Sequence, residues 1–287
     1  MLIPTLCIIG VGLIGGSLAR ALREANAVGE IIGAGRNAAS LRRALELKVI
    51  DRFETELERA VIDAEVVVVA VPLGAMFEVF KAIAGHLPED CVLTDVGSAK
   101  GSVLGEVRRA FGKAPSTLVL GHPIAGTEQS GVEASFAELF LHRRVILTPL
   151  VETEAWAHNL VRRMWESTGA EVIDMGVKHH DEVLAATSHL PHMLAYALVD
   201  TLARMDDRAE IFRYAAGGFR DFTRIASSDP QMWRDICLAN REPLLGALEL
   251  FSRDLACLTE YIKNGDSQAI METFQRAKHA RDNLYNE

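Results

Sequence analysis

A histidine ends one of the apolar runs of this chain, in a setting that favours chemistry. His122 lies in the segment GHPIAG (residues 121–126), directly after the run Leu118 to Leu120. We expect that run to be a β-strand and Pro123, which lacks a backbone N–H, to end it. Ligands of open α/β sheets bind at the carboxyl edge, where the His122 imidazole could take a proton or polarise a hydroxyl. The alternative is a histidine held in a turn by its proline and glycine neighbours.

A glycine-rich loop near the start of the chain is the second chemical signal. Residues 10–15, GVGLIG, separate the apolar run Thr5 to Ile9 from a stretch with apolar residues at helical spacing. Gly10 would make the tight turn, Gly12 would let backbone amides approach a pyrophosphate, and Gly15 would let the helix pack closely on the strand. The helix N-terminus adds free N–H groups. This order of strand, glycine loop and helix predicts a bound dinucleotide.

The end of the next predicted strand, Glu30 to Ala34, bears on which dinucleotide binds. An Asp or Glu there would accept hydrogen bonds from the adenosine ribose and repel a 2′-phosphate. The chain has Gly35-Arg36-Asn37 instead, so a guanidinium suited to phosphate stands beside the place of the missing acid. We therefore predict NADP in preference to NAD. The alternative is that Arg36 is only a solvated residue before a helix capped by Asn37 or Ser40.

Ser98 follows the predicted strand Val92 to Val96 and falls at the same carboxyl edge as Gly10 and His122. A serine just before a helix is most often its N-cap, and this is the interpretation that the local sequence favours. A capping serine can also hydrogen-bond a neighbouring imidazole or a nicotinamide amide. Lys100 is expected to be a surface residue of the helix that follows.

Apolar runs alternate with helical stretches along the first 175 residues, which is typical of a parallel sheet with helical crossovers. The continuously apolar run Val66 to Val71 indicates a central strand buried on both faces. From Val177 onward only helical patterns remain. We therefore predict an α/β fold, with a Rossmann-type, mostly parallel dinucleotide-binding domain over residues 1–175 and an all-α substrate and dimerisation domain over residues 176–287. Further expected elements are strands 117–120, 144–148 and 171–174 and helices 38–47, 75–87, 99–111 and 154–167.

The predicted helical half carries a polar stripe in an otherwise apolar segment. Its members recur at steps of four, three and four residues, which places them on one helix face. They are Asp181, Ala185, Ser188 and His192, with His179, His180 and His189 close by in the sequence. We interpret the stripe as the wall of a polar substrate pocket that faces the nucleotide domain. The alternative is a helix interface whose polar groups are satisfied within the protein. No metal site is predicted, because an HExxH motif is absent and Pro191 interrupts the last histidine pair.

Arg220 and Arg224, one helical turn apart, follow paired glycines and are suited to bind carboxylates with their planar guanidinium groups. Asp229-Pro230 is interpreted as the N-cap and first residue of the next helix. The stretches Arg241 to Ile262 and Ser267 to Leu284 are long and amphipathic. We predict that they form a homodimer interface.

Composition excludes several classes of protein. The chain of 287 residues is 49% hydrophobic and 24% charged, which is typical of a globular protein. Its 30 basic residues are scattered among 39 acidic ones, so we expect no nucleic-acid partner. The four cysteines show no CxxC spacing and mostly lie in apolar runs, which indicates buried thiols. We find no signal peptide and no uncharged run long enough for a membrane span, so we expect a cytoplasmic protein.

Six segments together resemble the prephenate and arogenate dehydrogenases of tyrosine biosynthesis, over essentially the whole chain. They are GVGLIGGS (10–17), VPLG (71–74), TDVGSAKG (94–101), GHPIAGTEQSG (121–131), TSHLPH (187–192) and GGFRDFTRIASSDPQMW (217–233). The resemblance implies an oxidoreductase that decarboxylates prephenate, arogenate or both while hydride passes to NAD(P). The products would be 4-hydroxyphenylpyruvate and tyrosine.

The same resemblance implies roles for individual residues. His122 would accept a hydrogen bond from the ring hydroxyl of the substrate, with Ser98 orienting it. Arg224 would bind a substrate carboxylate and Asp221 would hold Arg224. The other residues implied to line the substrate pocket are His192, His189, His180, Asp181 and Trp233. Contacts with the cofactor are implied for Gly10, Gly12, Leu13, Ile14, Gly15, Arg36, Val71 and Pro72.

Two other classes of protein remain as alternatives. The β-hydroxyacid dehydrogenases share the two-domain layout but need a lysine four residues before an asparagine, whereas here Lys178 precedes Glu182. A nucleotide sensor without turnover would not need Ser98, His122 and Arg224 together.

Substrate preference and regulation are the least determined properties. Prephenate and arogenate differ in a keto against an amino group, which we expect to lie near Ser227, Ser228 and Asp229. We predict an enzyme that accepts both or favours arogenate. Because the regulatory domain of some relatives has no counterpart in the sequence, we expect any inhibition by tyrosine to act at the active site.

Overall fold

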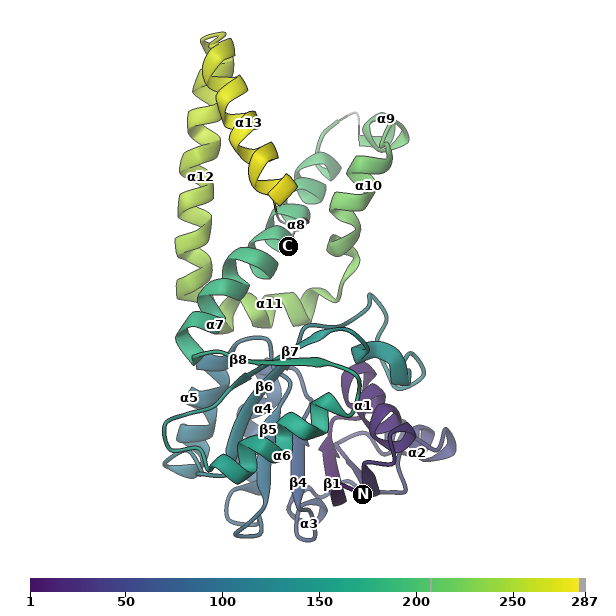
Figure 1. Cartoon of the computed structure of the whole chain (residues 1–287). Helices are drawn as coiled ribbons and strands as arrows, with labels where there is room; N and C mark the ends of the chain where they lie inside the picture. The colour runs from purple at the N-terminus through teal and green to yellow at the C-terminus, as the bar shows by residue number, and fades with distance from the viewer. Residues whose placement is uncertain (207, 284–287) are drawn as a thin grey trace. The chain divides into compact units, whose positions relative to one another are not determined.

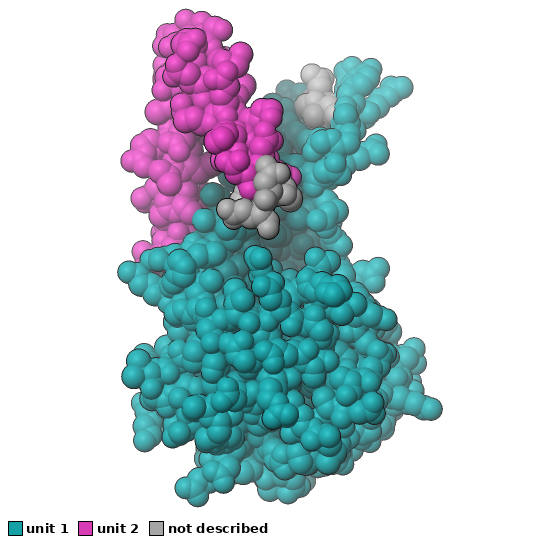
Figure 2. Space-filling view, viewed as in Figure 1, with its two compact units in different colours: residues 1–241 teal, residues 242–287 magenta. Residues whose placement is uncertain are grey.

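The computed structural model describes residues 1–206 and 208–283 (Figure 1). By its internal contacts the chain forms two compact units, Met1–Arg241 and Glu242–Glu287, which Figure 2 colours separately. This division does not test the boundary predicted between residues 175 and 176, which stays a prediction. Leu284, predicted to end the last helix, lies outside the described residues. No helix in the described ranges is long and apolar enough to cross a membrane.

The first unit contains one eight-stranded sheet of order β3-β2-β1-β4-β5-β6-β7-β8, parallel throughout except between β6 and β7. Its strands are β1 (Ile3–Ile9), β2 (Val28–Ala34), β3 (Arg52–Glu54), β4 (Val66–Val69), β5 (Val92–Asp95), β6 (Leu118–Pro123), β7 (Arg144–Thr148) and β8 (Glu171–Asp174). The predicted mostly parallel sheet is thus confirmed. Every residue of the central strand β4 is buried, as its apolar run indicates. The edge strand β3 is not predicted, because three residues carry too little pattern.

Strand β6 corrects one expectation about His122. The strand does not end before His122 but includes both it and Pro123, which pair antiparallel with Ile146 and Val145 of β7. Pairing with β5 stops at Val119, so β6 changes its partner from β5 to β7. A proline at the last position of a strand removes only a terminal donor, which the sheet tolerates. His122 therefore lies within a buried strand rather than in the turn after it.

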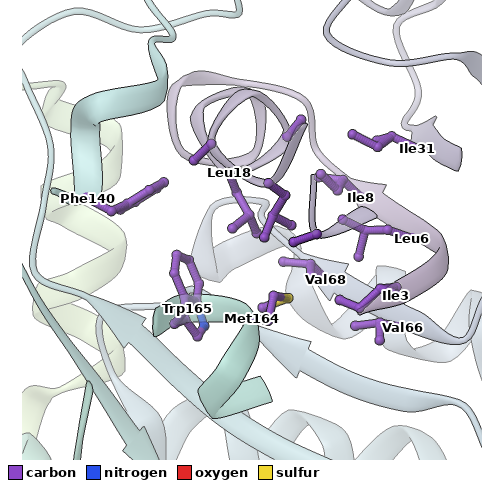
Figure 3. Packing of buried hydrophobic residues seen from close by; sticks show 14 of the residues in the cluster. Ile3, Leu6, Ile8, Leu18, Ile31, Val66, Val68, Phe140, Met164 and Trp165 are labelled. Carbon is purple, nitrogen blue, oxygen red and sulfur yellow. The ribbon is translucent and has the colours of Figure 1, made fainter. Parts of the chain in front are cut away.

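Helices cover both faces of the sheet (Figure 1). One face carries α1 (Leu13–Glu24), α2 (Ala38–Glu46) and α6 (Ala155–Glu166), and the other carries α3 (Leu57–Ala60), α4 (Met76–Ile83) and α5 (Lys100–Phe111). Successive residues of β1 point into opposite cores. Ile8 packs with Leu18 of α1 and Trp165 of α6 in the core shown in Figure 3, whereas Cys7 belongs to the core on the other face.

A helical segment completes the first unit. It consists of α7 (Val177–Leu184), the π-helical segment η3 (Ala185–His189), α8 (Leu190–Ala203), α9 (Arg208–Arg213), α10 (Gly217–Thr223), the 3₁₀ helix η4 (Arg224–Ser227) and α11 (Pro230–Ala239). Asp229 caps α11 through the N–H of Met232 at 2.7 Å, as predicted. Helix α7 packs on α5, and α11 packs on the 3₁₀ helix η1 (Leu73–Ala75), which follows β4.

The π-helical segment changes the predicted polar stripe. An extra residue per turn shifts the register of the helix face. Of the four predicted members, Asp181 and Ala185 are buried, whereas Ser188 and His192, at and beyond the π-helical segment, are half-buried. His180 and His189 are buried as well, so the interior face includes two residues that simple helical spacing does not select.

The second unit contains most of α12 (Arg241–Lys263) and all of the described part of α13 (Ser267–Asn283). It exposes large apolar side chains, namely Leu245, Leu250, Leu255, Ile262, Met271 and Phe274. Cys257 of α12 is exposed as well, in contrast to the buried Cys7 and Cys91. Both helices have apolar surface that this unit does not cover.

Candidate active site

The glycine loop between β1 and α1 has the geometry that its motif requires. Gly10 has a φ of +99°, and a Cβ there would lie 2.4 Å from the carbonyl oxygen of Ala70. A Cβ on Gly15 would lie 2.3 Å from the carbonyl oxygen of Gly10, so only glycine lets α1 approach the strand. A Cβ on Gly12 would meet no described atom within 4 Å. Space is therefore left in front of α1, where a pyrophosphate would bind.

The N-terminus of α1 can receive an anion. Its N-cap, Gly12, offers no side chain, and the first turn holds no acidic residue. The N–H groups at Leu13 and Ile14 thus meet no capping side chain from the described residues, which is the arrangement that binds phosphates. Val71 lies against this loop, since its Cγ1 would be 3.0 Å from a Cβ on Gly10, and the exposed Pro72 follows it.

The segment after β2 presents Arg36 to solvent. Asn37 caps α2, because its Oδ1 accepts the N–H groups of Ala39 at 3.0 Å and Ser40 at 3.1 Å. Ser40 is therefore not the cap. Arg36 is exposed and forms no ion pair with any residue in the described ranges. Its guanidinium is free to meet a ligand.

His122 begins a chain of hydrogen bonds that ends on a carboxylate. Its Nδ1 lies 2.9 Å from Nε2 of His180, and Nδ1 of His180 lies 2.8 Å from Oδ1 of Asp181. All three side chains are buried. Strand β6 supplies the first histidine and α7 supplies the other two residues, so sheet edge and helical segment build the site together.

The carboxylate of Asp181 also caps α5 from outside the helix. Its Oδ1 accepts the N–H of Lys100 and its Oδ2 accepts the N–H of Gly101, each at 2.8 Å. This arrangement corrects the expectation for Ser98, because the N-cap position is Ala99 and Ser98 makes no side-chain hydrogen bond within the described chain. The half-buried hydroxyl of Ser98 is therefore left for a ligand.

The hydrogen-bond chain determines which nitrogen of His122 is basic. Burial acts to raise the pKa of Asp181, but hydrogen bonds from His180 and from two backbone N–H groups outweigh it and lower that pKa. The ionised carboxylate makes His180 donate from Nδ1 and accept at Nε2, so His122 must donate from Nδ1. Burial, followed by the nearby His180 and Lys100, holds the pKa of His122 well below its usual value. His122 is therefore neutral, with its lone pair on Nε2.

Asn240, just after α11, joins this network without any sequence signal. Its Nδ2 donates to the carbonyl oxygen of Asp181 at 2.9 Å and lies 3.0 Å from Nδ1 of His189. Burial lowers the pKa of His189 to about 4, so the neutral ring can accept this hydrogen bond. Only the fold brings together Asn240 and Asp181, which are 59 residues apart.

His192 and Trp233 form a stacked pair, with ring centroids 3.7 Å apart and planes inclined by 21°. Nδ1 of His192 lies 2.8 Å from the carbonyl oxygen of Ser188. The indole Nε1 of Trp233 is buried and has no partner among the described residues. No group of three His, Cys, Asp or Glu side chains in the described chain is arranged to hold a metal ion.

Arg224 forms an ion pair with Glu128, in the loop after β6, rather than with Asp221 as expected. Asp221 is exposed on α10 and makes no contact of this kind with Arg224. Asp221 lies three residues from Arg224 in the chain, which made it the expected partner. Glu128 lies 96 residues away, and only the approach of its loop to η4 makes it the partner.

Lys100 is fully buried, which corrects the expectation of a surface lysine. Its Nζ lies 2.6 Å from Oδ2 of Asp95 and also donates to the carbonyl oxygen of Gly121. Asp95 was not predicted to belong to the site. Its position, an acidic residue at the end of an apolar strand, is a signal that could have indicated it. Lys178 is the lysine that was compared with the catalytic lysine of the β-hydroxyacid dehydrogenases. Its side chain is 91% exposed and pairs with Glu182.

Together these features define a class of protein. A parallel sheet with a glycine loop after its first strand, and a neutral histidine base on a strand at its carboxyl edge, belong to an oxidoreductase that uses a nicotinamide nucleotide. Residues 18–174 match the family model described as prephenate dehydrogenase, nucleotide-binding domain, and residues 177–276 match that of prephenate dehydrogenase, dimerization domain. The chain belongs to the prephenate dehydrogenase family.

Individual relatives agree with this assignment. The cyclohexadienyl dehydrogenase of Zymomonas mobilis is 38% identical over 279 residues, covering 96% of this chain and 94% of the relative. The crystal structure of Aquifex aeolicus prephenate dehydrogenase with hydroxyphenyl propionate and NAD⁺ has a TM-score of 0.90 and 39% identity, covering 98% of each chain. Synechocystis arogenate dehydrogenase has a TM-score of 0.82 and 26% identity, covering 98% of this chain and 99% of its own.

The glycine geometry predicts that two alanine substitutions affect different properties, one the stability and the other the binding of nucleotide. Gly15→Ala should lower the free energy of unfolding by about 1–3 kcal/mol, because its Cβ overlaps backbone that cannot move away. Gly12→Ala should change that free energy by less than about 0.5 kcal/mol and weaken nucleotide binding instead. Chemical denaturation and fluorescence titration with nucleotide measure the two effects. Equal stability of the two variants would contradict this assignment of roles.

The hydrogen-bond chain predicts that Asp181→Asn lowers kcat by about 100-fold or more. The uncharged amide would remove the negative charge that, through His180, stabilises a proton taken up by His122. The matched control is Asp174→Asn, which removes a carboxylate that bonds another histidine, His158, at 2.9 Å on the exposed side of α6. Steady-state kinetics of both variants test the prediction, and an Asp181→Asn enzyme as active as the control would refute it.

Proposed function

We propose that this chain catalyses the NAD(P)-linked oxidative decarboxylation of prephenate, arogenate or both, as a step of tyrosine biosynthesis. The observation that carries the proposal is the buried hydrogen-bond chain from Nδ1 of His122 through His180 to Asp181, at the carboxyl edge of a sheet with a dinucleotide-type glycine loop. The names of the relatives support the substrate class, since they include cyclohexadienyl, prephenate and arogenate dehydrogenases.

His122 would act on the ring hydroxyl of the substrate. As the carbon bearing that hydroxyl loses hydride, Nε2 of His122 takes the hydroxyl proton and a ring ketone forms. The carboxylate then leaves as carbon dioxide, the electrons of the broken C–C bond pass through the ring to the ketone oxygen, and the resulting phenolate takes the proton back from Nε2. When bound, the nicotinamide supplies the hydride acceptor. A proton added to Nε2 is stabilised through Nδ1 by His180 and the Asp181 carboxylate. Aromatisation makes the reaction irreversible.

Two further groups would bind the polar parts of the substrate. Arg224 is 65% exposed and pairs with a carboxylate that is itself partly exposed, so a substrate carboxylate can compete for it. Ser98, with no hydrogen bond in the described chain, would orient the hydroxyl at His122. His192 and Trp233 would form an aromatic wall beside them. In this arrangement His180, Asp181 and His189 support the site from behind instead of lining it.

The second unit and the family model of a dimerization domain support self-association. The apolar side chains exposed on α12 and α13 would be covered by a second copy of the chain. We propose a homodimer. Within each chain, we propose that the dinucleotide-binding domain ends at residue 175 and that the substrate and dimerisation domain begins at residue 176. The cytoplasmic location and the absence of a nucleic-acid partner stay predictions.

The substrate and catalytic base are tested together by initial rates at pH 7.5, with prephenate and arogenate crossed against NAD and NADP. We expect turnover with at least one pair, and the two substrates to be accepted together or arogenate to be favoured. His122→Asn should lower kcat by about 100- to 10,000-fold and leave nucleotide binding unchanged. The same replacement at the exposed His86 is the control. Folded wild-type protein without turnover on any pair would refute the proposed function.

The cofactor preference is tested at Arg36, which we propose binds the 2′-phosphate of NADP. Arg36→Ala should lower kcat/KM for NADP by about 10- to 100-fold, which is the usual effect of losing a hydrogen bond to a charged group. It should change kcat/KM for NAD little. Arg42→Ala removes another exposed arginine from the neighbouring helix α2 and is the matched control. An equal effect of Arg36→Ala on both nucleotides would contradict the proposed preference.

A further inference from the structure

Strand β6, which carries His122, stops pairing with strand β5 shortly before that residue. Strand β5 pairs with β6 at Leu118 and Val119, and beyond this point β6 pairs only with β7 among the described strands. Gly121 therefore has its backbone N–H and C=O directed toward the end of β5 without a strand to bond them. Buried backbone groups need partners, and an unbonded pair here would destabilise the strand next to the catalytic residue.

Two charged side chains replace the missing strand. Oδ1 of Asp95 accepts the N–H of Gly121 at 3.2 Å, and Nζ of Lys100 donates to the carbonyl oxygen of Gly121. The two side chains also bond each other at 2.6 Å, and Oδ2 of Asp95 accepts the N–H of Gly97 at 2.7 Å. Both side chains are entirely buried. The ion pair thus gives Gly121 the two hydrogen bonds that a longer strand β5 would otherwise provide.

Stability alone gives a weak reason for this pair. Moving two charges out of water is unfavourable, and apolar side chains of similar volume often replace a buried ion pair without loss of stability. A fixed position for Gly121 gives a stronger reason, because the next residue is His122. Lys100 also carries one of the two backbone N–H groups that bond Asp181. Two series of hydrogen bonds therefore meet at Lys100. One holds the backbone beside His122 through Gly121, and the other holds the His122 ring through His180 and Asp181.

We propose that Lys100 and Asp95 are positioning residues for His122, holding its backbone at the catalytic edge through the two hydrogen bonds of Gly121. The proposal deepens the proposed function and rests on it. Neither side chain touches the substrate in this arrangement. Both act through Gly121.

The charge of Lys100 has a second effect on the base. The groups that face the His122 ring are His180 and Asp181 of α7, His189 of η3, Lys100 of α5 and Asp95 of β5. After burial and His180, the Lys100 cation is a further cause of the low pKa of His122. Removing that cation raises the pKa, so the acid limb of the kcat/KM profile moves to higher pH.

Two double substitutions separate hydrogen bonding from charge. Asp95→Asn with Lys100→Gln removes both charges and keeps an acceptor and a donor for Gly121. Asp95→Leu with Lys100→Met removes charges and hydrogen bonds together and keeps similar volume. Lys178→Met, which removes an exposed lysine of α7, is the control. Thermal melts first establish that each variant is folded, and kinetics then use the substrate and nucleotide pair that is best for the wild-type enzyme.

We expect the apolar pair to lose about 100-fold in kcat, with KM for the nucleotide unchanged, because a displacement of about 1 Å at a catalytic group has an effect of this size. The amide pair should retain most of kcat, because Gly121 keeps a donor and an acceptor. Equal kcat in the two double variants would overturn the proposal. If the apolar pair does not fold, the amide pair decides alone: lost turnover would overturn the proposal.

A measurement without turnover separates this proposal from the proposed function. The ring resonances of His122 in ¹H–¹⁵N spectra, assigned by their loss in His122→Asn, should shift in the apolar pair and stay in place in the amide pair. An inactive wild-type enzyme would refute the proposed function and leave this test intact. Unshifted His122 resonances in the folded apolar pair would refute the positioning role alone.

Discussion

The carboxylate of Asp181 is the interaction on which the rest of the site depends. It accepts hydrogen bonds from His180 and from the backbone N–H groups of Lys100 and Gly101, so a single side chain of α7 caps α5 and fixes a histidine tautomer. These bonds lower the pKa of Asp181 against the opposing effect of burial, which keeps the negative charge in place. Because α7 begins the helical segment and α5 packs on the sheet, the same carboxylate joins the helical segment to the sheet layer.

The active edge is built from exceptions to regular structure. Strand β6 exchanges a parallel for an antiparallel neighbour at the residues that include His122. Helix α5 starts without a capping side chain of its own, and a π-helical segment separates α7 from α8. Each exception leaves backbone or ring groups that need partners, and the buried groups of Asp95, Lys100, Asp181 and Asn240 provide them. Regular elements form the scaffold, and polar side chains complete it where the chemistry occurs.

Membership of the prephenate dehydrogenase family agrees with this division of labour. In the function we propose, Arg224 and the His192–Trp233 pair contact the substrate, with Arg224 exposed, His192 half-buried and Trp233 buried. In the same proposal, the buried network behind His122 serves the hydroxyl chemistry that prephenate and arogenate share. The groups that bind the substrate and those that support the base would then be different parts of one site.

The sheet, the glycine loop and most strand and helix limits can be predicted from the sequence, because they follow from periodicity and from backbone geometry that acts over a few residues. The sequence also identified His122, Ser98 and Arg224 as a group, through motifs. It could not show that Lys100 is buried, that Arg224 pairs with Glu128 instead of Asp221, or that Asn240 bonds Asp181. Those contacts join residues that are distant in the chain, or depend on where a strand changes its neighbour. Only tertiary packing decides which polar groups lose water, and hence which partners they must find.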